Sequence, residues 1–147
     1  MTYEELKALN EAANCGLFAN PHRKKKHIED SLQIECVRWF TLQYPEYSAL
    51  LHHSPNGGAR SKVEGAIFKK MGVRPGFPDL FLYVPREYAP GKWYHGLAIE
   101  MKTEERGSRQ SDVQKLWEKR LSGMGYVYCV ARTVDNFISI CEEYLGR

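Results

Sequence analysis

Two apolar runs in the middle of the chain carry acidic residues, and this combination strongly constrains the fold. The segments are GFPDLFLYV, which begins at Gly76, and LAIEMKTEE, which begins at Leu97. Their length and apolar composition predict core strands over residues 77–84 and 96–102. Burying an unpaired carboxylate costs free energy, so the acids in these segments need a compensating partner.

The acids and a lysine occupy positions from which they can meet. Side chains alternate along a strand, so Glu100 and Lys102 point to one face and Met101 to the other. If the two strands are neighbours, Asp79 lies beside Glu100, and two close carboxylates repel unless a proton or a cation intervenes. A divalent ion such as Mg²⁺ prefers oxygen ligands, and the backbone carbonyl of Met101 could add one. The alternative is a surface ion pair between Glu100 and Lys102 on an edge strand.

This set of groups indicates phosphate chemistry. A metal with a lysine beside a phosphodiester is the equipment for hydrolysis by in-line displacement. The chain has neither the GxGxxG nor the GxxxxGK[ST] pattern, which makes a metabolic nucleotide-binding enzyme a poor interpretation. The histidines at 52, 53 and 95 lack HxH or HExxH spacing, and we expect them to be hydrogen-bonded neighbours rather than metal ligands.

The rest of the chain predicts helices around these strands. The expected elements, in chain order, are a short helix over 2–13, a helix over 28–43, a strand over 48–53, a helix over 61–71, the two strands above with a loop over 85–94 between them, a helix over 111–121, a strand over 126–131, and a last helix capped by Thr133. This order favours an α/β (α+β) fold with a mixed central sheet flanked by helices. The 147 residues fit one domain, with residues 1–27 as a helix and basic arm and residues 28–145 as the core.

Composition narrows the class of protein. The formal net charge of +3 permits nucleic-acid binding without demonstrating it. The four cysteines form no CxxC pair, so we expect reduced thiols rather than a zinc site or a disulfide framework. No apolar run has the length of a membrane span, and the N-terminus lacks the pattern of a signal peptide, so we expect a cytoplasmic protein.

The motifs and their order resemble the PD-(D/E)xK nuclease superfamily and, within it, the virus-type replication-repair nuclease family, VRR-NUC. The matching segments cover residues 28–145, and they are IEDSLQIECVRWF, SPNGGAR, KKMGVRPGFPDL, IEMK and SDVQKLW. The resemblance implies a restriction-endonuclease-like αβββαβ core with the active site at one edge. It also implies a Mg²⁺- or Mn²⁺-dependent endonuclease acting on branched or structured DNA, such as Holliday junctions or flaps, in phage or bacterial repair.

The resemblance also implies the roles of particular residues. Asp79, Glu100 and the Met101 carbonyl would bind the metal, and Lys102 would assist hydrolysis. A helix-borne acid and a glutamine complete the family site. The acid maps to Glu29 in the family's E-x-x-x-Q pattern, which makes Glu29 both a catalytic and a metal-ligand candidate, and the glutamine maps to Gln114.

Several alternatives stay open. Glu29 could instead be a first-turn acid facing the helix dipole, with Glu35 as the rival site acid, and Gln114 could simply complete a capping box with Ser111. SPNGGAR could be a plain turn or could hold a phosphate.

The basic residues expected to contact DNA are Lys24, Lys25, Lys26, Arg60, Arg106 and Arg109. The rival functions are a catalytically silent DNA-binding module and an RNA-directed nuclease of the same fold. A homodimer is plausible, since small nucleases often need two sites to cut two strands.

Overall fold

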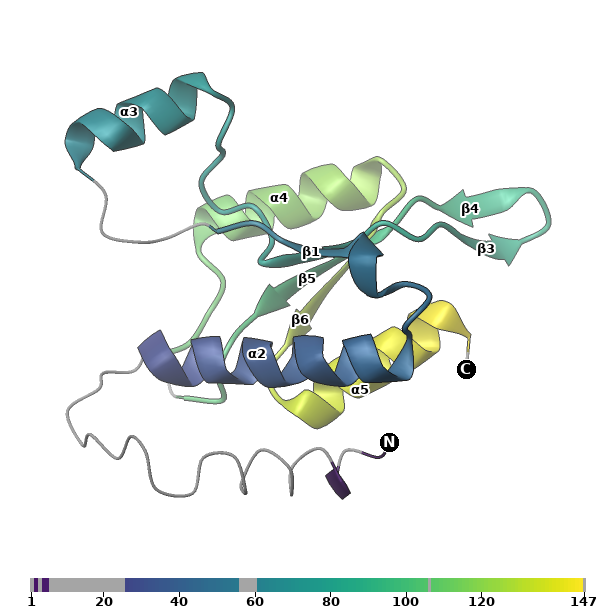
Figure 1. Cartoon of the computed structure of the whole chain (residues 1–147). Coiled ribbons are helices and arrows are strands. Elements are labelled where there is room, and N and C mark those ends of the chain that lie inside the picture. Colours follow the sequence, from purple (N-terminus) through teal and green to yellow (C-terminus); the bar gives the residue numbers. More distant parts are fainter. Residues whose placement is uncertain (1, 3, 6–25, 56–60, 106, 147) are drawn as a thin grey trace.

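A computed structural model of the chain describes residues 2, 4–5, 26–55, 61–105 and 107–146 (Figure 1). A sheet lies between two helical layers. Helix α4 (Asp112–Gly123) covers one face, and helices α2 (Lys26–Gln43) and α5 (Val134–Leu145) cover the other. Helix α3 (Lys62–Lys70) projects away from these layers. The predicted mixed α/β fold is confirmed.

The central sheet contains four strands in the order β1-β2-β5-β6. They span Leu51–His53, Leu80–Leu82, Leu97–Met101 and Val127–Ala131. The first three strands run antiparallel to their neighbours, whereas β5 and β6 are parallel and are joined by the crossover helix α4. A parallel pair needs such a long connection, which explains why α4 separates these two strands in the sequence.

The register between β2 and β5 brings the two acidic segments together. Leu80 pairs with Ile99 in an antiparallel register. Continued by one residue, this register sets Asp79 directly opposite Glu100. The two strands predicted from the acid-bearing apolar runs are therefore neighbours, and the condition for their carboxylates to meet is fulfilled.

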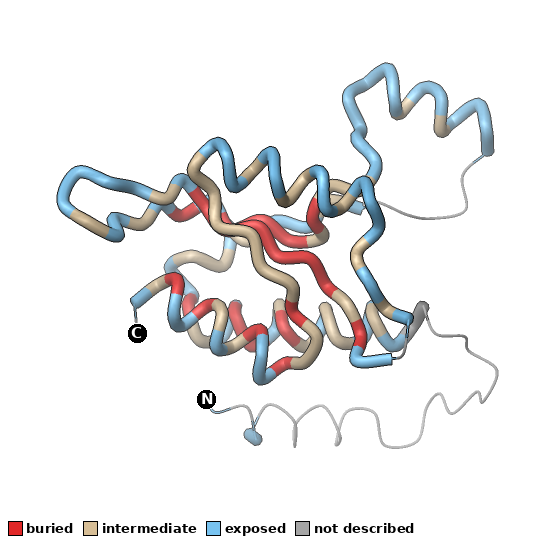
Figure 2. Tube along the Cα trace, turned by 180° about the vertical axis from the view of Figure 1, so that it is seen from behind, coloured by how far each residue is buried: buried red, intermediate tan, exposed pale blue. Residues whose placement is uncertain are grey.

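The hydrophobic core lies between the sheet and the α2–α5 layer, where buried positions are concentrated (Figure 2). Met101 points into it, opposite to Glu100 in the alternation along β5, as predicted. In the helix predicted over 28–43, Cys36, Trp39 and Phe40 lie at three- and four-residue spacing and form a core face, on which each is at most 4% exposed. Ile28, near the start of the helix, is 51% exposed, because the start of α2 extends beyond the core.

The prediction of an irregular loop over residues 85–94 is wrong. The segment forms a hairpin of β3 (Arg86–Ala89) and β4 (Lys92–Tyr94), separate from the central sheet. The turn is closed at Gly91, whose φ of 72° suits glycine and whose backbone N–H donates to the Glu87 carboxylate. The two prolines suggested a loop, but both lie outside the paired strands, at positions 85 and 90, where no ladder hydrogen bond is lost.

Other differences concern boundaries. The strand predicted over 48–53 begins with a 3₁₀ turn, Ser48–Leu50, before β1. The strand predicted over 77–84 is confined to β2, since Pro78 has no N–H to donate to a ladder. Strand β6 is mostly half-buried, because it is an edge strand rather than a fully covered one.

The predicted N-terminal helix lies mostly outside the described residues. At its start, the Thr2 N–H donates to the Glu5 carboxylate and the Glu5 N–H to the Thr2 hydroxyl, which is the reciprocal pair that the capping box predicts. Cys36, Cys129 and Cys141 are free thiols, and Cys15 lies outside the described residues. Among the described helices, none is long and apolar enough to cross a bilayer.

Candidate active site

Asp79 is held against the strand that carries Glu100. The Met101 backbone N–H donates a 2.8 Å hydrogen bond to Asp79 Oδ2. On the other side of Asp79, its carbonyl oxygen is bonded by His53 Nδ1 at 2.7 Å and accepts from the Ser54 N–H at 3.1 Å. Asp79 is therefore bonded to both neighbouring strands, which fixes its carboxylate just before the start of β2.

Glu100 is a buried acid with an incomplete set of partners. Its side chain is 2% exposed. Oε1 accepts a 2.5 Å hydrogen bond from Gln114 Nε2 and lies 3.8 Å from the Lys102 ammonium. Within the described part of the chain, Oε2 is buried and accepts no hydrogen bond. A buried carboxylate oxygen without a donor is costly, so this atom indicates a missing partner.

The pKa of Glu100 also indicates that this buried carboxylate lacks a compensating positive charge. Burial raises the pKa of Glu100 to about 9, and the neighbouring Asp79 carboxylate adds to the increase, whereas Lys102 opposes it. Two adjoining carboxylates can hydrogen-bond to each other only if one of them holds a proton. The protein on its own thus favours a proton at this position, and a cation would serve equally well.

Gln114 completes the capping box of α4 and also contacts Glu100. Its side-chain oxygen accepts from the Ser111 N–H at 2.8 Å, and its own backbone N–H donates to the Ser111 hydroxyl, which completes the capping box of α4. The amide nitrogen of the same side chain then donates to Glu100. The helix start and the buried acid are coupled through one residue.

Glu29 lies near Asp79 and Glu100, but its side chain is only half-buried, whereas that of Glu100 is buried. Burial raises its pKa; the charge of Lys102 lowers it and that of Asp79 raises it, so the carboxylate senses both groups. Glu35, the rival acid on α2, instead acts on Cys36: burial, with a contribution from Glu35, raises the pKa of that thiol to about 12. Glu29 is therefore placed near Asp79 and Lys102.

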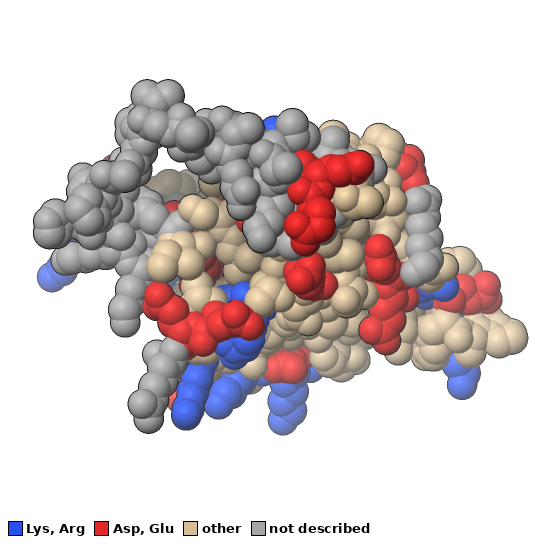
Figure 3. All heavy atoms as spheres, turned by 90° about the horizontal axis from the view of Figure 1, so that it is seen from below, with Lys and Arg blue, Asp and Glu red and all other residues tan. Residues whose placement is uncertain are grey.

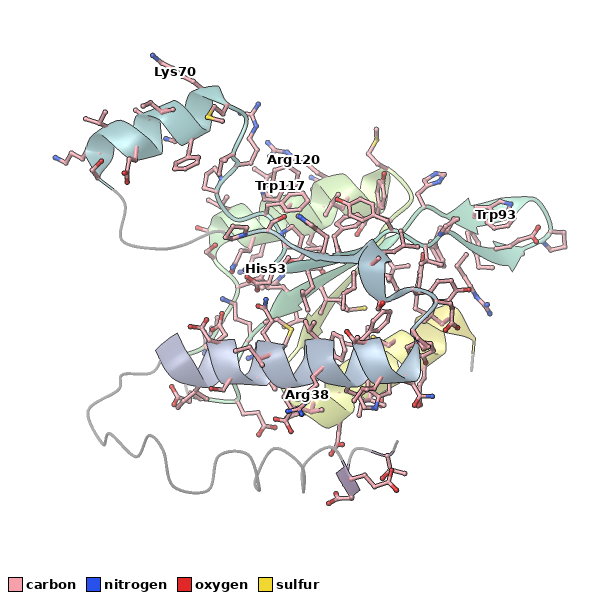
Figure 4. All side chains as sticks on the ribbon, in the orientation of Figure 1. Arg38, His53, Lys70, Trp93, Trp117 and Arg120 are labelled. Carbon is pink, nitrogen blue, oxygen red and sulfur yellow. The ribbon has the colours of Figure 1, made fainter. Side chains whose placement is uncertain are left out.

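Helix α4 also fixes the segment that leads into Asp79, a contact that the sequence did not predict. Trp117 Nε1 donates to the Pro75 carbonyl at 3.0 Å, and its ring meets Phe77 edge-on (Figure 4). Gly76 has a φ of 75°, and a Cβ there would lie 2.6 Å from the Val113 side chain. Val113 and Trp117 are four residues apart, and this spacing predicts a shared apolar helix face but not what that face contacts.

The predicted DNA contacts are only partly within the described residues. Lys24, Lys25, Arg60 and Arg106 lie outside them, as does the side chain of Lys26, whereas Arg109 is exposed. Its loop is fixed by Arg132, whose guanidinium donates to the carbonyls of Thr103 and Ser108. On the α2–α5 side, acidic side chains are spread over the visible face and most Lys and Arg lie near its rim (Figure 3).

The oxygen atoms at this centre fit a divalent cation. Asp79 and Glu100 supply two carboxylates, one with a buried oxygen that lacks a donor, and Mg²⁺ and Mn²⁺ accept such oxygen ligands. Among the described residues, no three or more His, Cys, Asp or Glu side chains lie together as a ready metal site. Glu29 is thus a neighbour of the carboxylate pair rather than a third member of a formed cluster.

Comparison with known proteins identifies the family. The sequence model of the VRR-NUC domain matches residues 20–135, most of the chain. The chain belongs to the VRR-NUC family. A solved structure titled "VRR_NUC domain protein" is 34% identical, with a TM-score of 0.67, and the match covers 80% of this chain and 88% of that chain. A search of curated proteins finds no match to this chain. Membership implies a nuclease, and the PD-(D/E)xK nucleases generally use a divalent metal.

The double role of Gln114 in this VRR-NUC domain can be separated by mutation. Gln114→Glu should keep the cap, because glutamate makes the same reciprocal bond, but it replaces the donor to Glu100 with an acid. We expect a loss of about 1–3 kcal/mol in the unfolding free energy at pH 7 in EDTA, measured by denaturant melts. Ser111→Ala, which removes only the hydroxyl of the cap, should cost about 1 kcal/mol. If Gln114→Glu is as stable as the wild type, the contact with Glu100 has no energetic role.

Proposed function

We propose that this protein is a metal-dependent DNA endonuclease that hydrolyses phosphodiester bonds in branched or structured DNA. The observation that carries the proposal is the carboxylate pair of Asp79 and Glu100, set opposite each other by the strand register, with an unpartnered buried oxygen and a lysine alongside. A structural salt bridge would leave no orphaned oxygen in the core. A cation between the two carboxylates accounts for one, as does a proton that Glu100 shares with Asp79 while no cation is bound.

Four groups would hold the metal, which would be Mg²⁺ or Mn²⁺. They are the carboxylates of Asp79 and Glu100, the Met101 carbonyl, and the Glu29 carboxylate, as a direct ligand or a close neighbour of the ion. Bound there, the ion would polarise the phosphate and lower the pKa of an attacking water. The strong preference of the free pair for a proton supports this assignment, because the same charge deficit attracts a cation.

The other residues would position and stabilise the reacting groups. The Lys102 ammonium would orient water or offset negative charge on the phosphate as it develops. Gln114 would fix the rotamer of Glu100 through its amide, so that Oε2 stays directed toward the metal. Buried residues that hold one another in this way keep a site in its productive geometry without a cost at the moment of reaction.

DNA would be held by basic residues around the site. Arg109 lies in the loop that follows β5 and Lys102, and we propose that Arg60, Arg106 and the basic run at 24–26 make further phosphate contacts. Such contacts weaken as salt rises. We also propose a preference for branched DNA and a setting in a bacterial cell or phage-infected host, as the resemblance to the VRR-NUC family implies. We also propose a homodimer, in which two sites would cut two strands.

A cleavage assay tests the proposed function. Wild type and Asp79→Asn are incubated with duplex, single-stranded, flap and four-way-junction DNA and with matched RNA, in Mg²⁺, Mn²⁺ or EDTA. We expect wild type alone to cut, only with metal, and to prefer a branched DNA, while Asp79→Asn still binds it. Metal-dependent cutting of RNA alone would make the protein an RNA-directed nuclease. Tight binding to a junction without cutting would make it a recognition module.

A further inference from the structure

Helix α3 is folded but has no buried residue. It spans nine residues, and its N-terminus is fixed by a full capping box between Ser61 and Glu64. Every residue in it is exposed or half-exposed, and the helix stands clear of the sheet (Figures 1 and 2). Helices this short are marginal in water unless one face is covered. The capping box stabilises its start, but its outer surface has no role in the core.

One face of α3 is apolar and open to solvent. Val63, Ile67 and Met71 are spaced four residues apart, which places them in one row along the helix. Their exposures are 69%, 51% and 73%. A continuous apolar row of this kind is unusual on a free surface and marks an interaction site.

The charge around this apolar row points to DNA as its partner. Residues 62–74 contain four basic residues, Lys62, Lys69, Lys70 and Arg74, and one acidic residue, Glu64, so the segment has a net charge of +3. This equals the formal net charge of the whole chain. Lys70 points away from the body of the protein (Figure 4). A polyanion would neutralise this surface, and a second copy would bring like charges together.

The size of the helix also disfavours a second copy. A nine-residue helix is about 13 Å long and about 10 Å wide, whereas a stable dimer buries roughly 800 Å² on each partner. Three side chains on such a helix cover far less. Apolar side chains on a basic surface are the means by which DNA-binding proteins cover or separate base steps.

The chain segments on both sides of α3 lead back to the candidate active site. The Ser54 N–H, before the helix, donates to the Asp79 carbonyl, and Pro75, after it, accepts from Trp117. Met71 precedes Asp79 by eight residues, so it lies within about 29 Å even if the chain is fully extended. That span is about eight base-pair steps of 3.4 Å.

We infer that Val63 and Ile67 of α3, together with Met71 at its C-terminal cap, pack against unstacked bases at a DNA branch point, while the lysines beside them hold the backbone. An apolar row can replace the stacking neighbour that a base loses when it is unstacked at a branch. The inference rests on the proposed function, since it assigns branch recognition to a part of the same nuclease. It predicts cuts within about eight nucleotides of the branch.

The test compares binding rather than cleavage. Val63→Gln/Ile67→Gln/Met71→Gln keeps helix propensity and charge, and it is made in the Asp79→Asn background so that DNA stays intact. We expect the affinity for a four-way junction to fall about tenfold and that for linear duplex to change less than about twofold. Met124→Gln, which alters a methionine that is 72% exposed after α4, should change neither. Lys69→Gln/Lys70→Gln should weaken both and lower the salt slope by about 2.

Each contrary result has a distinct meaning. An unchanged junction-to-duplex ratio in the triple variant overturns the inference, even if wild type cuts junctions as proposed. If wild type cuts nothing, the proposed function fails, and the binding ratio still decides the role of α3. A change from dimer to monomer in the triple variant, measured by light scattering, would show that a second copy covers the row. A lower melting temperature would show that the chain itself does. Either result overturns the assignment to DNA.

Discussion

Glu100→Gln is expected to make the metal-free protein more stable while abolishing cleavage. The glutamine oxygen can still accept from Gln114, and its amide can donate to the Asp79 carboxylate. The cost of keeping a proton on a buried acid that is ionised in the unfolded chain disappears. The raised pKa of about 9, against 4.5 for an ordinary glutamate, corresponds to a gain of about 3 kcal/mol at pH 7. Loss of a metal ligand should lower the cleavage rate by roughly 10³-fold or more.

The stability gain should depend on pH in a defined direction. Below pH 4.5 both folded and unfolded wild type hold the proton on Glu100, and the group costs nothing. As the pH rises toward 9, the unfolded chain ionises while the folded one keeps its proton, so wild-type stability falls. The difference between Glu100→Gln and wild type should therefore grow from pH 5 to pH 8 in EDTA, measured by denaturant melts.

A nearby acid provides the control for that prediction. Glu104 is exposed in the loop that follows Lys102, so Glu104→Gln removes a carboxylate without altering a buried contact and should leave the stability unchanged. If Glu100→Gln instead lowers the stability in EDTA at pH 8, Glu100 stabilises the fold, and its interpretation as a metal ligand is wrong.

Lys102→Met should separate catalysis from metal binding. Methionine keeps an unbranched side chain but removes the ammonium that lies 3.8 Å from Glu100. We expect a loss of about 10²–10³ in the single-turnover cleavage rate, which is typical of removing one group that stabilises transition-state charge. Binding of Mn²⁺ should change little, because lysine offers no ligand to a cation. An unchanged rate would leave Lys102 without a catalytic role.

Much of the candidate site could be predicted because it depends on local rules. Strand alternation placed Glu100 and Met101 on opposite faces, and neighbouring strands then brought Asp79 to Glu100. Gln114 was harder to predict, since its sequence spacing is explained fully by the capping box. Only the structure shows that its amide nitrogen is still available to reach Glu100.

The features that the sequence missed depend on long-range contacts. Trp117 and Pro75 are far apart in the chain, and no local pattern links an indole to that carbonyl. The exposure of Ile67 could not be predicted either, because helical spacing shows which residues share a face but not whether anything covers it. The hairpin at 86–94 was missed because two prolines outweighed short β-rich segments on either side of the turn.

Isothermal titration with Mn²⁺ tests the central claim most directly, because it measures the cation site without DNA or chemistry. Wild type is titrated beside Glu100→Gln, with Lys102→Met as the variant that alters the neighbouring charge only. The account predicts saturable binding to wild type, a loss of at least about tenfold in affinity for Glu100→Gln, and near-normal binding to Lys102→Met. Equal affinity for wild type and Glu100→Gln would contradict it and would place the metal elsewhere.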